Sequence, residues 1–189
     1  WLSVNDSRII PILAPLDGLS VKNTTTGSDI TKYIFESEML KDNRVVVIGG
    51  EPEDVDFIMH SWGVRNYKHH NPPMNFISHP EQMQSCVDFV IYAQPRITFL
   101  CVGSPQQELL AAAIARKSNE SGLLMCVGAS LDFLSGKQRR APAFMQRLRL
   151  EWFYRFCLNP RKLAKRYFIR CPKVLFFLLA GFNAKSREK

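Results

Sequence analysis

The chain has 189 residues, enough for one domain with a substantial core, and its composition is ordinary for a globular protein, with 46% hydrophobic and 22% charged residues. Its charge is uneven, because residues 137–189 hold 15 Lys and Arg against 2 Asp and Glu, whereas the residues before them hold 10 basic and 15 acidic side chains. A basic end on a mildly acidic body indicates an anionic partner there: nucleic acid, a membrane surface or a phosphorylated substrate.

Cysteines and apolar runs narrow the class of protein. The five cysteines include no Cys-x-x-Cys pair, which favours a reducing compartment over a disulfide framework. No signal-peptide pattern is present, and the apolar run Val174–Phe182 is far shorter than the roughly 20 residues of a spanning helix. We therefore expect no membrane crossing by this chain. Because Trp1 opens what looks like a strand approach, we also expect a segment to precede it.

Strand and helix patterns alternate along the chain. The predicted strands are Arg8–Pro15, Arg44–Gly50, the short VRNYKHH, Ile97–Gly103 and Leu123–Ser130. The predicted helices are one capped at Gly27-Ser28-Asp29 and ending at Leu40, Pro52–Trp62, Pro80–Ala93, and one with Ser104 as N-cap and Pro105 at the first position. Strand, glycine turn and helix in repetition predict a parallel α/β sheet with crossover helices. The pattern turns helical near Ala143, so we predict domains over residues 1–142 and 143–189.

Glycine ends three predicted strands, at Gly49-Gly50, Gly103-Ser104 and Gly128. Glycine lets a ligand approach the backbone, and the helix N-terminus that follows favours phosphate. Each turn taken alone is equally well explained as a tight connection, and none forms a GxGxxG or Walker A loop. Since parallel strands end at one edge of a sheet, the three together favour a nucleotide or phosphosugar.

Polar side chains are expected at the same edge. Gln107 and Glu108 fall in the first turn of a helix, where complementing the helix dipole also explains Glu108. Asp132 follows the third glycine turn. Asp17 follows the first strand directly, and in its Asp-Gly pair it is either a turn residue or a general base. The pair His69-His70 fits no standard zinc spacing, so no metal is predicted.

Longer motifs carry a family resemblance. VGSPQQE, VGASLDFLSGKQRRAP and LEWFYRFCLNPRKLAKRY resemble segments of the WecG/TagA/CpsF family of bacterial glycosyltransferases. LDGLSV, GSDI and RVVVIGG precede them in the expected order, so the resemblance covers about Leu13 to Tyr167. A single motif of this kind is a weak signal, whereas the ordered set is specific.

The resemblance implies a Rossmann-like α/β body and a basic, helical C-terminal appendage that meets the membrane. It implies a UDP-sugar-dependent enzyme that moves an N-acetylmannosamine-type sugar or another hexose, with inversion, onto a polyprenyl-diphosphate-linked sugar. The product would be a cell-surface polysaccharide or a teichoic-acid-type polymer. No cofactor or metal is implied, and the place of action would be cytoplasmic, peripheral on the inner face of the membrane. The sugars and the oligomeric state, a homo-oligomer included, stay open.

Site residues follow from the resemblance motif by motif. Asp17 would be the general base that deprotonates the acceptor hydroxyl. The donor pocket would be lined by Gly49, Gly50, Gly103, Ser104, Gln107, Glu108, Gly128 and Asp132. The phosphates and the acceptor would be held by Arg140, Arg155, Lys162, Lys165 and Arg166, since arginine forks match phosphate oxygens in pairs.

The basic end also has an amphipathic pattern. From Pro160 on, Leu163, Ala164, Tyr167 and Phe168 fall on one helix face and Arg161, Lys162, Lys165 and Arg166 on the other. This pattern favours a helix that lies in the membrane interface over one whose apolar face packs on its own domain. Two other functions compete: a basic nucleic-acid-binding module, which leaves the glycine turns unexplained, and a non-catalytic, membrane-associated homologue that binds UDP.

Overall fold

The computed structural model describes residues 25–118, 122–136, 142, 145, 150–158, 160 and 164. The chain divides into two compact units, Thr25–Arg139 and the combination of Trp1–Thr24 with Arg140–Lys189. The predicted strand Arg8–Pro15 lies outside the described residues. The predicted domain boundary after residue 142 stays a prediction.

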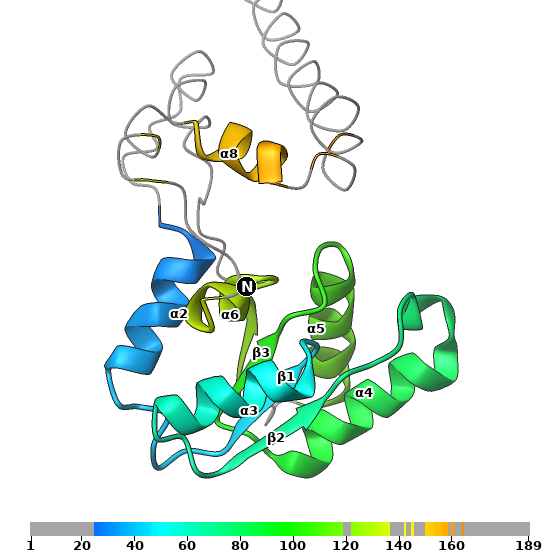
Figure 1. Ribbon diagram of the computed structural model, residues 1–189. Helices are drawn as coiled ribbons and strands as arrows, with labels where there is room; N and C mark the ends of the chain where they lie inside the picture. Colours follow the sequence, from blue (N-terminus) through cyan, green and yellow to red (C-terminus); the bar gives the residue numbers. More distant parts are fainter. Residues whose placement is uncertain are drawn as a thin grey trace, which may run out of the picture. The chain divides into compact units, whose positions relative to one another are not determined.

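The unit Thr25–Arg139 alternates helices with strands (Figure 1). Its elements are α2 (Gly27–Glu36), β1 (Val45–Ile48), α3 (Pro52–Ser61), β2 (Tyr67–His70), the 3-10 helix η2 (Phe76–Ser78), α4 (Pro80–Ala93), β3 (Ile97–Leu100), α5 (Gln106–Lys117), β4 (Leu123–Cys126) and α6 (Ser130–Leu134). The four strands form one parallel sheet in the order β2-β1-β3-β4. The predicted α/β class, a Rossmann-like parallel sheet with flanking helices, is confirmed.

A hydrophobic core lies on each face of the sheet, which makes three layers. On one face, alternate residues of β1 and β3, such as Val47 and Phe99, pack with α2, α3 and α6. On the other face, the intervening residues, such as Ile48 and Leu100, pack with α4 and α5. Figure 1 shows α2 beside α6 and α4 beside α5. Because both faces are covered, every residue of β1 and β3 is buried, which explains their continuous apolar sequences.

Two predicted helix starts are wrong by one residue. Thr26, not the glycine after it, caps α2, because its hydroxyl accepts the Asp29 N–H (3.1 Å). The same helix ends at Glu36 and not at the predicted Leu40, because Glu38 has a φ of +60°, outside the helical region. Helix α5 has Pro105 at the N-cap with φ −89° and ψ 7°, so it begins at Gln106, and the Ser104–Pro105 peptide is cis.

Helix α8 (Glu151–Leu158) belongs to the other unit and is described by itself. The Leu150 carbonyl accepts the Phe153 and Tyr154 N–H groups, both at 3.1 Å, and so opens its first turn. The predicted amphipathic pattern beyond Pro160 falls almost entirely outside the described residues. Within the described part of the chain, no helix combines the length and apolar character needed to cross a membrane.

Candidate functional site

The strand order creates one crevice position at the carboxyl edge of the sheet. From β1 the chain first moves outward to β2, and from there it crosses back to β3 and on to β4. The loops after β1 and β3 therefore leave the sheet in opposite directions. In parallel sheets ligands bind at this switch point, next to the carboxyl ends of the strands. The loops after β1, β3 and β4 hold the glycines that the sequence singled out.

Gly49, at the end of β1, is required by close packing between loops. It has φ +92°, and a Cβ there would lie 2.9 Å from Val102 Cγ1 and 3.0 Å from the Cys101 carbonyl carbon. Its N–H donates to the His70 carbonyl (2.8 Å). Only glycine lets the loops after β1 and β3 approach so closely. The structure thus shows a packing role for Gly49, and a Cβ on Gly50 would lie 3.2 Å from Val55 Cγ2. That Gly49 and Gly50 line the donor pocket stays a prediction.

Gly103, after β3, has the opposite surroundings. Its φ is +80°, and a Cβ there would have no atom of the described residues within 4 Å. The space beside its Cα is therefore free of described atoms, next to the start of α5. Ser104 follows it and is exposed. Of the predicted donor-pocket glycines, Gly103 is the one whose open surroundings suit a ligand.

Gln107 links the loops after β3 and β4. It is 8% exposed, its Oε1 accepts the Gly128 N–H (2.8 Å), and its Nε2 donates to Glu108 Oε1 (3.0 Å). Its own N–H donates to the Gly103 carbonyl (2.9 Å). The structure thus brings four predicted site residues together at one edge of the sheet.

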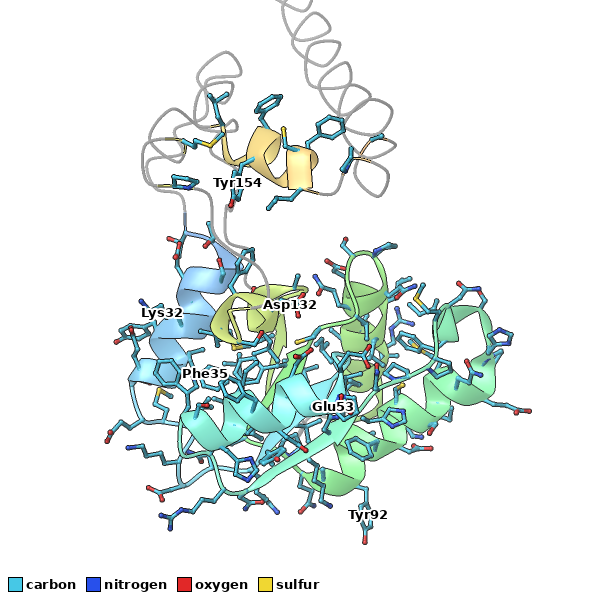
Figure 2. All side chains as sticks on the ribbon, in the orientation of Figure 1. Lys32, Phe35, Glu53, Tyr92, Asp132 and Tyr154 are labelled. Carbon is cyan, nitrogen blue, oxygen red and sulfur yellow. The ribbon has the colours of Figure 1, made fainter. Side chains whose placement is uncertain are left out.

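Two carboxylates stand at this edge, each close to a cysteine. Burial raises the pKa of the Cys101 thiol well above its ordinary range, and the charge of Asp132 raises it further. Burial also raises the pKa of Cys126, with the charge of Glu108 as the second cause. Figure 2 labels Asp132 on α6. Both thiols stay protonated at neutral pH, so neither is suited to act as a nucleophile.

Residues that sequence reasoning missed or set aside also lie here. His69 Nε2 donates to the Gly49 carbonyl (3.2 Å) and so holds the turn after β1. The His70 ring packs against the Phe89 ring in a tilted arrangement, with ring centroids 5.2 Å apart. Burial lowers the pKa of His70, and His69 lowers it further. Both histidines end β2. The reasoning that selected the glycines, namely that the carboxyl ends of parallel strands lie near the site, would therefore have selected them too.

The start of α2, with its GSDI sequence, packs near this edge as well. A Cβ on Gly27 would lie 3.6 Å from Ser130 Oγ at the start of α6. The Ser130 hydroxyl donates to the Val127 carbonyl (2.6 Å), which fixes the turn after β4. GSDI therefore contributes to the edge by supporting α6.

The remaining predicted site residues are not placed. Asp17, Arg140, Lys162, Lys165 and Arg166 lie outside the described residues, and Arg155 falls within α8 of the other unit. Among the described residues, no three His, Cys, Asp or Glu side chains come together as metal ligands. The expectation that the enzyme uses no metal or cofactor stays a prediction from the resemblance.

A hollow of about 390 Å³ lies at the opposite, amino edge of the sheet. It is lined by Asp42, Asn43, Arg44, Gln94, Pro95, Arg96 and Gly122. These residues precede the strands or end α4, so none of them belongs to the carboxyl edge. The hollow is separate from the predicted site.

A comparison with known protein families covers nearly the whole chain. A family model described as "Glycosyl transferase WecG/TagA/CpsF family" matches residues 1–188, essentially the whole chain. The match includes the loops after β1, β3 and β4 and the segment that forms α8. With its parallel α/β sheet and its glycine-rich carboxyl edge, the chain belongs to the WecG/TagA/CpsF family of glycosyltransferases.

Proposed function

We propose that this chain transfers a sugar, with inversion, from a UDP-sugar to a sugar linked by diphosphate to a polyprenyl lipid. The product enters the synthesis of a cell-surface polymer. The observation that carries the proposal is the free space beside the Gly103 Cα at the switch point, in a chain whose family consists of glycosyltransferases.

The donor phosphates bind against the start of α5 in this proposal. Among the longer helices at this edge, α2 has its N-terminus capped by Thr26, and α3 carries Glu53 and Asp54 in its first turn, which repel phosphate. Figure 2 labels Glu53 on α3. Helix α5 has no side-chain cap and follows the open Gly103. Helix α5 has one acidic residue, Glu108, in its first turn, against two in α3, and its Gln107 N–H already donates to the Gly103 carbonyl (2.9 Å). In this proposal the phosphates bind to the other N–H groups at the start of α5.

The chemical step needs a general base, and we assign this role to Asp17, which lies outside the described residues. Asp17 takes the proton from the acceptor hydroxyl as that oxygen attacks the anomeric carbon. The new carbon–oxygen bond forms while the bond to the UDP oxygen breaks, which inverts the anomeric centre. UDP leaves with the bonding electron pair and a negative charge. Arg140, Arg155, Lys162, Lys165 and Arg166 are the basic residues proposed to bind the phosphates and the lipid-linked acceptor.

The basic end suits a peripheral position on the inner face of the membrane. Residues 137–189 hold 15 Lys and Arg, and each basic residue near an anionic leaflet contributes about 1 kcal/mol of attraction. A polyprenyl-linked acceptor stays in the bilayer, so the enzyme has to reach it there. Vesicle flotation with and without anionic lipid tests this position, and binding that ignores anionic lipid contradicts it.

A sugar-transfer assay tests the activity. Radiolabelled UDP-sugars are offered in turn with a short-chain polyprenyl-diphosphate-linked amino sugar, using the full chain and Asp17→Asn. Labelled lipid product that disappears in the variant supports both the transferase and its base. UDP binding without product from any donor indicates the non-catalytic alternative, and binding of nucleic acid without UDP binding indicates the other rival.

A further inference from the structure

The amide orientation of Gln107 is fixed by its partners. The Gly128 N–H is a donor, so the side-chain atom 2.8 Å from it must be the oxygen Oε1. The nitrogen Nε2 then points to Glu108 Oε1, 3.0 Å away, which as a carboxylate oxygen accepts the bond. Both ends of the buried amide are used by the protein itself. These two bonds use one of the two N–H groups of Nε2 and one of the two lone pairs of Oε1, and they hold the amide against Gly128 and Glu108.

Gln107 connects Gly103 with the loop after β4 and with the first turn of α5. Its N–H bonds the Gly103 carbonyl (2.9 Å), its side chain bonds the loop after β4, and its Nε2 holds Glu108 in the first turn of α5. The Gly128 N–H has a second acceptor, the Leu100 carbonyl at 3.2 Å. Loss of the side-chain bond therefore loosens the loop after β4 without leaving this N–H unsatisfied.

We propose that Gln107 is a positioning residue that acts through Gly128 and Glu108, setting the spacing of the loops after β3 and β4 and the direction of the Glu108 carboxylate. This inference rests on the proposed UDP-sugar site. It divides the predicted donor residues into two groups. Glu108 and the Gly103 backbone contact the donor, whereas Gln107 acts indirectly, by holding these two groups in place.

Two substitutions separate the two bonds. Gln107→Met keeps the length of the side chain and removes both hydrogen bonds. Gln107→Glu keeps an acceptor for the Gly128 N–H but repels Glu108, so only the second bond is lost. Gln106→Met is the matched control, because Gln106 is the preceding residue of the same helix turn and makes no side-chain hydrogen bond within the described residues.

The experiment measures two independent quantities on the full-length chain. Amide hydrogen exchange of Gly128 is followed by NMR, and the Kd for UDP is measured by calorimetry, with far-UV circular dichroism to confirm that each variant is folded. We expect Gln107→Met to speed Gly128 exchange about fivefold and to weaken UDP binding about tenfold, the size of one or two net hydrogen bonds. Gln107→Glu keeps the exchange rate and weakens UDP binding, while Gln106→Met, the control for the hydrogen-bonded link, leaves Gly128 exchange unchanged.

The outcomes distinguish this inference from the proposed function. Unchanged Gly128 exchange in a folded Gln107→Met variant overturns the hydrogen-bonded link. Faster exchange with unchanged UDP affinity overturns the positioning role and leaves Gln107 as a structural residue. If the unaltered chain binds no UDP, the proposed donor site fails and the positioning role fails with it, while the Gly128 exchange still tests the link by itself.

Discussion

Gly49 and Gly103 provide a matched test of how the carboxyl edge is built. Both have φ between +80° and +92°, so replacing either with alanine costs about 1–2 kcal/mol of backbone strain. Only at Gly49 does the added Cβ meet neighbours, with Val102 Cγ1 at 2.9 Å and the Cys101 carbonyl atoms at 3.0 and 3.1 Å. Overpacking of this kind costs about 1–3 kcal/mol more. Gly49→Ala should therefore destabilise the fold by about 2 kcal/mol more than Gly103→Ala.

Urea unfolding followed by far-UV circular dichroism measures the difference. If the free energy of unfolding falls by about 2 kcal/mol per molar urea, a difference of about 2 kcal/mol makes the unfolding midpoint of Gly49→Ala about 1 M lower than that of Gly103→Ala. Adding Val102→Ala to Gly49→Ala should recover only part of the loss, because the contacts with the Cys101 backbone remain. Equal midpoints for the two single variants would refute the argument that loop packing requires Gly49. Gly103→Ala should instead weaken UDP binding, since its methyl group projects into the open space.

Three further predictions follow from the core and from the pKa directions. Phe99→Ala should lower the free energy of unfolding by about 3–5 kcal/mol, whereas Phe57→Ala, 59% exposed, should change it by less than about 0.5 kcal/mol in the same urea titration. Burial lowers the pKa of His70 below 6.5, so at this residue the folded chain binds fewer protons than the unfolded chain, and the stability of the fold falls as the pH drops through about 6.5. His70→Gln should reduce this pH dependence in a series of thermal melts. An unchanged slope would count against this role of His70. Burial raises the pKa of Cys86 to about 11, so iodoacetamide at pH 8 should label the exposed Cys157 first and reach Cys86 only on unfolding, as peptide mass spectrometry would show.

Local sequence patterns were sufficient for most of the elements. The predicted helix Pro80–Ala93 has the observed bounds of α4, because Pro80 suits the first helical position. Unbroken apolar runs correctly indicated β1 and β3, since strands covered on both faces need no polar alternation. The cap of α2 was misplaced by one residue. Several polar side chains stand together there, and only the three-dimensional turn decides that the Thr26 hydroxyl receives the Asp29 N–H.

The sequence by itself determined the α/β class, the glycine turns at the strand ends and, through its ordered motifs, the family. These features are encoded in neighbouring residues, through hydrophobic periodicity, caps and turn chemistry. Tertiary structure alone decided that Gly49 is packed and Gly103 open, and that Gln107 bonds Gly128, 21 positions along the chain. Such contacts depend on the strand order β2-β1-β3-β4 and on the register of β3 with β4. Both arise from packing two helical layers on one sheet, which no local pattern specifies.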